Sequence, residues 1–325
     1  MYDIIAIGEL LIDFAEKGVN ENNFPILSAN AGGAPSNFLA TLSKYDAKTA
    51  LISKVGDDAF GNLLIKTISD CGIDTKAIIK DPCFFTTLAF VTLDKDGDRS
   101  FSFARKPGAD TQICIKDIDF SLIDSSKAFH FGTLSLTQNP AKTATKKAVL
   151  YAHKQKKLIT FDPNLRLMLW DSKSDAKKQI LWGLKYADVV KISEEEISFL
   201  WGCDAKKGAD ILLNEFNVSL AMVTCGANGC YLKNKNAFVS VKTIKVSPID
   251  TTGAGDIFGG SAISCILKLQ KNPSELNETE LLYIANFANT AAALSTERFG
   301  GIPSIISKEK VLSQMKANNF NIIKI

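Results

Sequence analysis

The sequence predicts an α/β fold in which helices cover both faces of a doubly wound, mostly parallel sheet, giving three αβα layers, with a small second β-sheet added. Short apolar segments alternate with longer amphipathic segments through most of the chain. The apolar segments are rich in β-branched and aromatic residues at consecutive positions, which is typical of strands buried on both faces. One region, residues 83–104, breaks this alternation.

The expected elements can be given in chain order as residue ranges. The buried strands are expected at 4–7, 49–52, 129–131, 158–161, 189–192 and 220–223. The helices are expected at 35–44, 59–71, 140–154, 174–185 and 194–201. Because helices follow strands through most of this order, we expect parallel strands joined by crossover helices.

Residues 83–104 predict the second sheet. Two alternating segments flank the sequence Asp-Lys-Asp-Gly-Asp at 94–98, and an Asp-Gly turn between such segments is a hairpin signal. Paired with residues 10–16, the hairpin would form a small separate sheet, which we interpret as a lid; an extra hairpin on a sandwich is the alternative. We expect one domain over residues 1–325, with the lid formed by about 10–30 and 83–110.

Composition excludes several classes of function. The 325 residues are 46% hydrophobic and 22% charged, which is ordinary for a globular enzyme. A net charge of +3 without a basic stripe gives no sign of nucleic acid binding. No apolar segment of about 18 residues and no signal peptide is visible, so we expect no membrane partner and a cytoplasmic location. The seven scattered cysteines suggest reduced thiols.

The most informative motif is Asp-Thr-Thr-Gly-Ala-Gly-Asp at residues 250–256. Gly253, Ala254 and Gly255 open a helix, where free N–H groups suit a phosphate and glycine allows close approach. A carboxylate at Asp256 would repel phosphate, which makes sense if it accepts the proton of the attacking hydroxyl. The helix start would keep Asp256 ionised and only weakly basic. A capping role for Asp256 remains equally open on this pattern.

Two other phosphate motifs are absent from the sequence. No Gly-x-x-x-x-Gly-Lys-[Ser/Thr] occurs; residues 56–61 have the glycine spacing, but Asn62 follows where a lysine is needed. Gly253, Gly255 and Gly259 have one residue too many for the dinucleotide pattern. Neither a P-loop nor a Rossmann site is therefore expected.

The motif at 250–256 resembles the C-terminal signature of ribokinase-like (PfkB-type) carbohydrate kinases, and a counterpart of the N-terminal signature lies at 31–37 and continues to 54–61. Segments similar to those of fructokinases lie at 8–14, 161–166, 191–196 and 287–289. The resemblance covers nearly the whole chain. It implies a ribokinase-like αβα core with a β lid, ATP and Mg²⁺, and transfer of the γ-phosphate to a sugar hydroxymethyl, with fructose as first choice and fructose 6-phosphate as product.

The resemblance also implies roles for single residues around the sugar. Asp256 matches the catalytic base, and Gly253, Ala254 and Gly255 match the anion hole. The sugar-binding candidates are Asp13, Gly32, Gly33, Asn37, Phe101, Phe103, Arg105 and Arg166. The alternatives are a solvated strand end for Asp13, a tight turn for the two glycines and surface ion pairs for the arginines. We expect the phenylalanines at 84, 85, 101 and 103 to form the core of the lid.

For the nucleotide and the metals the resemblance implies two further groups. The nucleotide-binding candidates are Asn164, Lys191, Ser193, Thr224, Gly226, Gly229 and Asn289. Glu196 would organise Mg²⁺ through water, with Ser193 replacing the usual asparagine, or would be an exposed helix acid. The candidates for a K⁺ site are Asp250, Thr252 and the carbonyls near Ser295, Arg298, Gly300 and Ser304.

Alternatives remain at this point. Lys106 stands where fructokinases often have asparagine, and together with Arg105 and Arg166 it keeps 2-keto-3-deoxygluconate as a second acceptor. A sugar sensor without catalysis is a further alternative, against which the intact Asp256 and glycine loop argue. An exposed edge of the lid could pair two copies into a homodimer. His130 and His153 belong to no motif; we expect the first in the core and the second in solvent.

Overall fold

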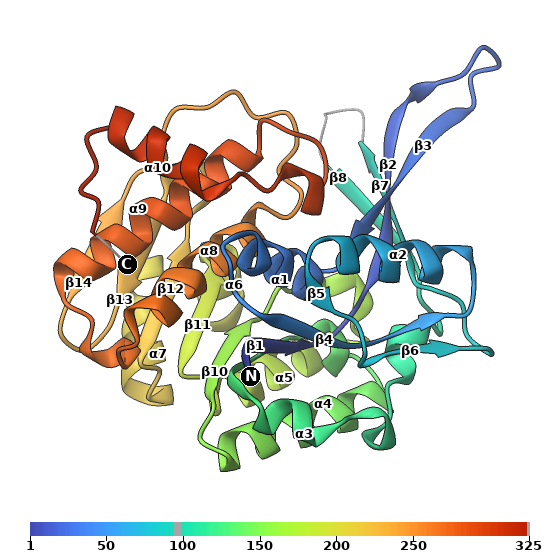
Figure 1. Cartoon of the computed structure of the whole chain (residues 1–325), viewed down its shortest axis with the longest axis horizontal. Helices are drawn as coiled ribbons and strands as arrows, with labels where there is room; N and C mark the ends of the chain where they lie inside the picture. Colours follow the sequence, from blue (N-terminus) through green and yellow to red (C-terminus); the bar gives the residue numbers. More distant parts are fainter. Residues whose placement is uncertain (94–98, 324–325) are drawn as a thin grey trace.

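The computed structural model of the chain describes residues 1–93 and 99–323. A large, mostly parallel sheet lies between two layers of helices, and a smaller sheet extends from one side of this body (Figure 1). The predicted α/β fold with three layers and a small second sheet is confirmed. Within the described part of the chain, no helix is long and apolar enough to cross a membrane.

The main sheet contains the six predicted strands and four more, as far as the chain is described. In spatial order its strands are β14 (Phe238–Val241), β13 (Cys230–Lys233), β12 (Leu220–Thr224), β11 (Val189–Ser193), β10 (Leu158–Asp162), β9 (Ser126–Gly132), β1 (Tyr2–Ile7), β4 (Thr49–Gly56) and β5 (Ile73–Asp74), with β6 (Ile78–Asp81) also paired to β4. The pairs from β5 to β12 are parallel, and β13 and β14 are antiparallel. The unpredicted strands are short or half-exposed, so they lack the apolar pattern that identified the others.

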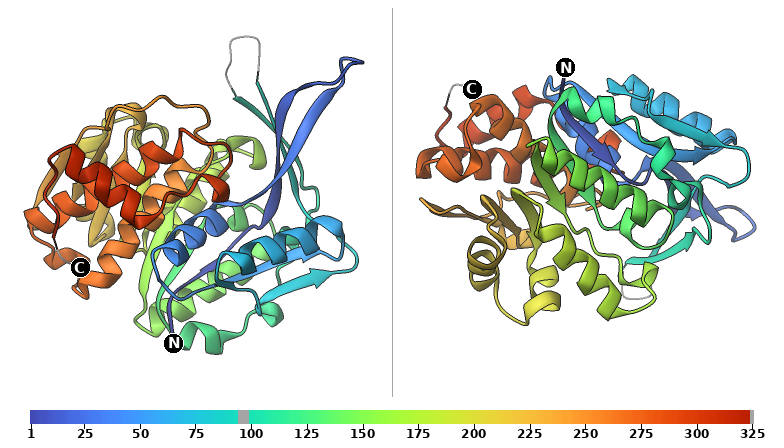
Figure 2. Two further views of the ribbon diagram at one scale, coloured as in Figure 1. Left: turned by 45° about the horizontal axis from the view of Figure 1, so that its top comes forward. Right: turned by 90° about the horizontal axis from the view of Figure 1, so that it is seen from below.

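Two layers of helices cover the sheet, and the views in Figure 2 separate them. One layer contains α1 (Ala34–Lys44), α2 (Ala59–Asp70), α8 (Ala254–Leu269), α9 (Glu278–Ser295) and α10 (Lys308–Ala317). The other contains α3 (Phe120–Asp124), α4 (Ala141–Lys154), α5 (Lys173–Leu184), α6 (Glu194–Trp201) and α7 (Ala205–Phe216). Along β1 the side chains alternate between the two resulting cores: Ile4 faces one, and Ile5 faces the other. Short 3₁₀ turns are η1 (Ala109–Gln112), η2 (Ile115–Asp117), η3 (Leu134–Leu136), η4 (Leu167–Leu169), η5 (Gly226–Asn228), η6 (Pro273–Glu275) and η7 (Ile302–Ser304).

The smaller sheet has the order β3 (Pro25–Gly32), β2 (Leu11–Val19), β7 (Leu88–Leu93) and β8 (Arg99–Ala104). β2 pairs in parallel with β7, whereas the other two pairs are antiparallel. β2 and β3 form an arm that projects from the body (Figure 1). The expected pairing of residues 10–16 with the hairpin is confirmed, although the turn at 94–98 lies outside the described residues. β3 was not expected as a strand.

The aromatic core of the smaller sheet differs from the expected one. Phe14 stacks on Phe90, with ring centroids 5.2 Å apart, and meets the edge of Phe60 at 5.6 Å. Phe85 is 80% exposed, so its assignment to the core was wrong. It precedes β7, in a segment without the alternation of a strand. The side chain of Phe101 lies outside the part described.

Candidate active site

The loop at Gly253–Asp256 begins α8 as the sequence predicts. Gly253 is the residue before the first helical turn, and its φ of 75° is a left-handed conformation that favours glycine. No side chain caps this helix end. Asp256 lies in the first turn, and its Oδ2 accepts a hydrogen bond from Asn37 Nδ2 at 2.9 Å. The capping alternative for Asp256 therefore has no support, because its carboxylate joins α8 to α1 instead.

A cavity of about 330 Å³ opens beside Asp256 and gathers most of the predicted sugar-binding residues. From the predicted set it contains Asp13, Gly33, Asn37, Phe103, Arg166, Gly253 and Asp256. These residues come from β2, the start of α1, β8, the segment after β10 and the start of α8. The walls thus join the smaller sheet, one helix layer and the loops that follow strands of the main sheet, as expected at the carboxyl ends of parallel strands.

Gly32 and Gly33 allow the chain to turn closely around this cavity. A side chain at Gly32 would overlap the carboxylate of Asp13, and one at Gly33 would lie 2.5 Å from the carbonyl oxygen of Glu9. Gly33 also has a φ of 107°, which L side chains rarely adopt. Gly33 therefore requires glycine for steric reasons, and a side chain at Gly32 would displace the Asp13 carboxylate, so the tight turn and the ligand contact are compatible.

Three carboxyl groups at this cavity have raised pKa values. Burial, followed by the charge of Asp162, raises the pKa of Asp256 to about 6. Burial and the charge of Asp256 raise the pKa of Asp13 to about 7. Burial raises the pKa of Glu9 to about 7, although the Arg105 charge and the Ala34 N–H lower it. Burial thus makes Asp256 more basic than the helix start alone suggested, because desolvation outweighs the stabilising helix start.

Arg105 does not reach either cavity of the site. The residue is 4% exposed, and its guanidinium pairs with Asp110 at 2.7 Å and donates to the carbonyl oxygen of Leu134 at 2.9 Å. The predicted sugar contact at Arg105 is corrected accordingly: the residue is an internal brace behind Leu134, which lines the cavity. Its buried pairing with Asp110 also excludes a surface ion pair. Arg166, in contrast, lines both cavities.

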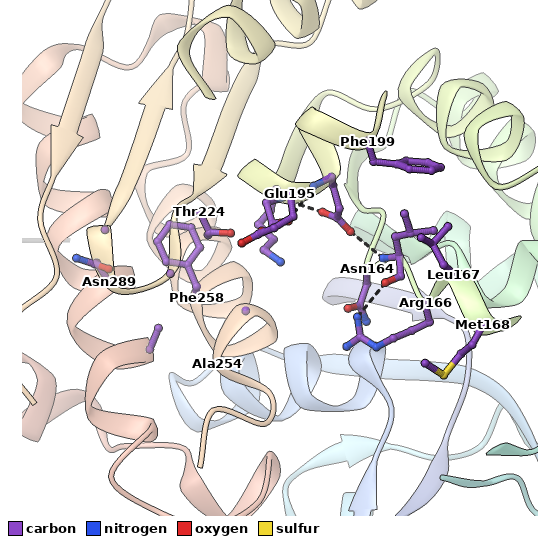
Figure 3. A pocket seen from close by; sticks show the side chains of 18 residues that line it. Asn164, Arg166, Leu167, Met168, Glu195, Phe199, Thr224, Ala254, Phe258 and Asn289 are labelled. Carbon is purple, nitrogen blue, oxygen red and sulfur yellow. Dashed lines mark hydrogen bonds between the residues drawn. The ribbon is translucent and has the colours of Figure 1, made fainter. Parts of the chain in front are cut away.

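A second cavity of about 560 Å³ adjoins the other side of the loop. Figure 3 shows Asn289 and Thr224 on one side of it, Arg166 and Met168 on the other, and Ala254 between them. All of the predicted nucleotide-binding residues line it: Asn164, Lys191, Ser193, Thr224, Gly226, Gly229 and Asn289. Its volume lies within the ~300–1,000 Å³ of small-molecule pockets.

A buried ion pair lies under the loop between the two cavities. Lys191 Nζ is 3.0 Å from Asp162 Oδ2, and a side chain at Gly255 would lie 2.9 Å from the same ammonium. Burial lowers the pKa of Lys191, but the charges of Asp162, Glu196 and Asp256 outweigh it and raise the pKa. Lys191 therefore carries a fixed positive charge directly beneath the N–H groups of the loop.

Glu196 is held by the backbone. Its Oε1 accepts from Leu165 N at 2.7 Å, and its Oε2 accepts from Ser193 N at 2.9 Å in a capping box at the start of α6. It is 8% exposed, so it is not the exposed helix acid of the alternative. Burial and then Asp162 raise its pKa. Since a carboxylate has about four acceptor sites, two remain for metal-bound waters. These residues fit Mg²⁺ bound through water.

The far end of the second cavity is formed by a turn and by α9. Gly226 and Gly229 have φ values of 52° and 103° in the turn after β12. Asn289 Nδ2 donates to the carbonyl oxygen of Lys242 at 2.9 Å. This contact fixes the amide beside the turn.

The predicted K⁺ ligands lie on segments next to the Gly253–Asp256 loop. Asp250 Oδ1 accepts from Thr252 N and Oδ2 accepts from Gly300 N, both at 2.8 Å. Arg298 N donates to the carbonyl oxygen of Ser295 at 3.1 Å, and the hydroxyl of Ser304 donates to the carbonyl oxygen of Gly301 at 2.7 Å. An oxygen-rich set suits a hard cation. No cluster of three or more His, Cys, Asp or Glu ligands occurs among the described residues.

The sequence reasoning missed two acids of the site, Glu9 and Asp162. Glu9 lies just after the carboxyl end of the buried strand β1, and Asp162 is the last residue of the buried strand β10. An acid at that edge of a parallel sheet was the available signal. His130 is buried in the core as expected: it stacks on Phe38 at 3.9 Å, and burial lowers its pKa to about 3. His153 is exposed, also as expected.

The fold, the helix-start loop and the paired cavities together define a carbohydrate kinase. The family profile "pfkB family carbohydrate kinase" matches residues 1–308, so the chain belongs to this family. It is 37% identical to Fructokinase-1 of Zea mays over 314 residues, which cover 95% of this chain and 96% of that protein. The resemblance inferred from the motifs is confirmed.

Solved structures agree in fold over almost the whole chain. Fructokinase with bound ATP from Xylella fastidiosa has a TM-score of 0.88 and 27% identity, covering 98% of this chain and 100% of that one. A fructokinase double mutant from Vibrio cholerae O395, bound to fructose, ADP and potassium ion, has 0.84 and 28%, covering 96% and 98%. A putative Ribokinase II from E. coli in complex with ATP and Mg²⁺ has 0.85 and 26%, covering 98% and 100%.

Proposed function

We propose that the protein transfers the γ-phosphate of ATP to the hydroxymethyl group of fructose, giving fructose 6-phosphate and ADP. The observation that carries this proposal is the Asp256 carboxylate between two cavities, one lined by hydroxyl-binding side chains and one by a glycine turn. The similarity to fructokinases over the full chain supports fructose as the acceptor.

In this mechanism Asp256 accepts the proton of the sugar hydroxyl as its oxygen attacks the γ-phosphorus. The bond to the β-phosphate oxygen breaks, and ADP leaves with that electron pair. The N–H group of Gly255 and the charge of Lys191 stabilise the phosphoryl oxygens in transit. The Ala254 N–H donates to the Thr251 carbonyl oxygen at 3.2 Å, and it would exchange this partner for a phosphoryl oxygen. Asn37, which donates to Asp256 Oδ2, orients the other carboxylate oxygen toward the acceptor.

We also propose sites for Mg²⁺ and K⁺ from the residues beside the two cavities. Mg²⁺, when bound, neutralises charge on the β- and γ-phosphates, and Glu196 would hold its water ligands. K⁺ would be held by Asp250, Thr252 and the carbonyls near Ser295, Arg298, Gly300 and Ser304. The Mg²⁺ and potassium in similar structures support both. Turnover that is equal in K⁺, Na⁺ and choline buffers would reject the K⁺ site.

The charges of the sugar cavity favour a neutral acceptor over 2-keto-3-deoxygluconate. Glu9, Asp13 and Asp256 line it, whereas Arg166 is its one cationic side chain among the described residues. Of the three cationic residues on which the sugar-acid alternative depended, Arg105 is paired with Asp110, Lys106 does not line the cavity, and only Arg166 does. The carboxylate of a sugar acid would be repelled by these acidic side chains. The raised pKa values of the same side chains show that the cavity already disfavours negative charge.

An ADP-release assay with several acceptors tests this proposal. We expect kcat/KM for fructose to exceed that for ribose, tagatose, inosine and 2-keto-3-deoxygluconate by at least about tenfold, which corresponds to ~1.4 kcal/mol. A preference for the keto acid would overturn the charge argument while leaving kinase activity intact. ADP release that does not depend on any sugar would overturn the proposed function itself.

The smaller sheet is proposed as a lid within one kinase domain spanning the chain, with the lid formed by about residues 10–30 and 83–110. Asp13 on β2 and Phe103 on β8 line the sugar cavity, so movement of the sheet would open or close it. Closure would exclude water and suppress ATP hydrolysis. Sugar-dependent protection of β2 and β7 amides from hydrogen exchange would test this role.

We also propose a homodimer through the lid. The arm formed by β2 and β3 exposes Val19, Phe24, Ile26 and Leu27, of which Phe24 is 66% exposed. An exposed apolar strand edge is a surface suited to pairing. Sedimentation of wild type and Phe24→Ser should give a dimer and a monomer, respectively; a monomeric wild type would reject the proposal.

The cytoplasm remains the proposed compartment, because the cysteines are free thiols, and cell fractionation would test it.

A further inference from the structure

A large hollow lies at the opposite edge of the main sheet from the proposed active site. It is bordered by the starts of β10 and β12 and by the carboxyl ends of α4 and α8. Its volume is about 910 Å³, compared with about 330 and 560 Å³ for the two cavities of the site. It shares no lining residue with them, so the proposed kinase reaction does not account for it.

The side chains around this hollow are predominantly basic. The basic residues that line it are Lys127, His153, Lys154, Lys156, Lys157 and Lys271. The one carboxylate is Asp188, and its Oδ2 is already engaged by the Ile159 N–H at 2.7 Å. For a chain whose net charge is only +3, this is a marked local concentration of positive charge.

Some of these charges are neutralised within the chain and others are not. Lys127 pairs with Asp3 at 2.8 Å, and Lys271 pairs with Glu280 at 2.5 Å. Lys154 and Lys156 make no ion pair with any residue in the described ranges. Two lysines at the rim therefore keep their full charge for an external anion.

The backbone gives an independent observation. Lys156 and Gln270 line the hollow in left-handed conformations, with φ values of 55° and 52°. The other described non-glycine residues with positive φ are asparagines or an aspartate, which tolerate it: Asn23, Asp46, Asn164, Asn217 and Asn319. Each of the two strained residues lies just beyond a helix, where glycine is favoured. The chain thus places long polar side chains at two positions where glycine would fit with less strain.

Helix ends alone do not explain this arrangement. Lysines near a helix carboxyl terminus stabilise its partial negative charge, and this accounts for Lys154 at the end of α4. It does not require Lys156 or Gln270, because glycine at either position would relieve the strain and leave Lys154 and Lys157 in place.

We propose that this hollow is a second binding site, for a phosphorylated small molecule. The rim lysines and Gln270 would hold the phosphate, because ammonium and amide groups donate to phosphate oxygens. Leu158, Ile266 and Pro273 supply an apolar wall for the rest of the ligand. Both sugar phosphates and nucleotides have this chemistry. The site does not rest on the proposed kinase activity.

Isothermal titration of the full chain tests the site with three probes: pyrophosphate, fructose 1,6-bisphosphate and ADP. The test variant is Lys156→Gly combined with Gln270→Gly. The control is Asn217→Gly, which makes the same backbone change at the end of α7, outside the hollow. Any binding at the proposed active site is common to all three proteins, so the difference between isotherms reports the hollow.

We expect wild type and Asn217→Gly to show a binding event that the double variant loses or weakens at least tenfold. Raising the salt from about 20 to 200 mM should weaken the same event severalfold, because screening acts on exposed charges. The melting temperature of the double variant should equal or exceed that of wild type, which excludes misfolding as the cause. Tighter binding of either organic probe than of pyrophosphate identifies the source of the phosphate.

The proposal is overturned if none of the probes gives an event that differs between wild type and the double variant. It is also overturned if Asn217→Gly weakens that event as much as the double variant does. Because the titration requires no turnover, either result is distinct from a failure of the fructose assay.

Discussion

The two cavities on either side of the Gly253–Asp256 loop recognise their ligands with different parts of the chain. The sugar cavity presents the ionisable side chains Glu9, Asp13, Asp256 and Arg166. The nucleotide cavity also has ionisable side chains, Arg166, Lys191, Glu195 and Glu196, but it adds a glycine turn, helix-start N–H groups and apolar walls such as Phe258. A point substitution changes a side chain but leaves the backbone N–H groups in place. Single substitutions at the uncharged far end of the nucleotide cavity should therefore act more weakly than those on the sugar side.

The largest effect should come from Asp256, where the two sides meet. Asp256→Asn keeps the shape and an acceptor oxygen for Asn37 but removes the base. We expect kcat to fall by about 10²–10⁴-fold, the usual contribution of general acid–base catalysis. ATP affinity by titration should stay within about twofold of wild type. Turnover within tenfold of wild type would exclude Asp256 as the base.

On the sugar side alone, Asp13→Asn should raise the KM for fructose by about 10- to 100-fold, since a hydrogen bond to a charged group contributes ~1.5–3 kcal/mol. The KM for ATP should not change. Asn62→Asp, at an exposed position of α2, changes one charge outside both cavities and serves as the control. An equal rise in both KM values would show that Asp13 acts through the fold.

Asp13→Asn should weaken fructose binding but stabilise the folded protein at high pH. The pKa of Asp13 is about 7 in the folded protein against an ordinary value of 3.8, so folding takes up a proton between these pH values. The free energy of unfolding therefore falls as pH rises through this window. At pH 8 Asp13→Asn should melt higher than wild type without ligands, and at pH 4 the difference should vanish. A lower melting temperature at pH 8 would contradict the burial of the charge.

The pH dependence of kcat/KM should change activity less than the substitutions above, and it reports on Asp256. Asp256 must be ionised to accept a proton, and its pKa is about 6. We expect kcat/KM to be constant above about pH 7 and to fall up to tenfold per unit below pH 6. ATP binding measured without turnover should change much less over this range. If kcat/KM instead began to fall only near pH 4, the carboxylate of Asp256 would not be desolvated.

The smallest effect is expected at the far end of the nucleotide cavity. Asn289→Ala removes the hydrogen bond to the Lys242 carbonyl oxygen, a neutral contact that contributes ~1 kcal/mol. The KM for ATP should rise about fivefold, with the KM for fructose unchanged. A loss above a hundredfold would show that this side also depends on single side chains, and the contrast between the cavities would fail.

Much of this arrangement was predictable because it depends on local sequence. Buried strands have consecutive apolar residues, and the helix-start loop requires glycine at fixed spacing. The edge strand β14 and its neighbour β13 were not predictable, since half-exposed short strands lack that pattern. The contacts of Arg105 were not predictable either, because only the fold brings Asp110, Thr137 and the Leu134 carbonyl oxygen around its guanidinium.

The raised pKa values also needed the fold. The helix start alone suggested a low pKa for Asp256, and the opposing desolvation depends on how the layers close around it. Glu9 was overlooked because it belongs to no phosphate-binding motif, although it lies two residues after a buried strand. Contacts between residues far apart in sequence, such as Asn37 with Asp256, appear only in the assembled structure.

The close approach of Gly32 to Asp13 has a genetic consequence. Every other amino acid adds at least a Cβ, and at this position that atom would occupy the space of the Asp13 carboxylate. Any missense change at codon 32 therefore damages the sugar cavity, whatever the chemical character of the new residue. In a saturation library selected for growth on the sugar, this codon should tolerate only synonymous changes, whereas exposed Gly202 should accept some substitutions.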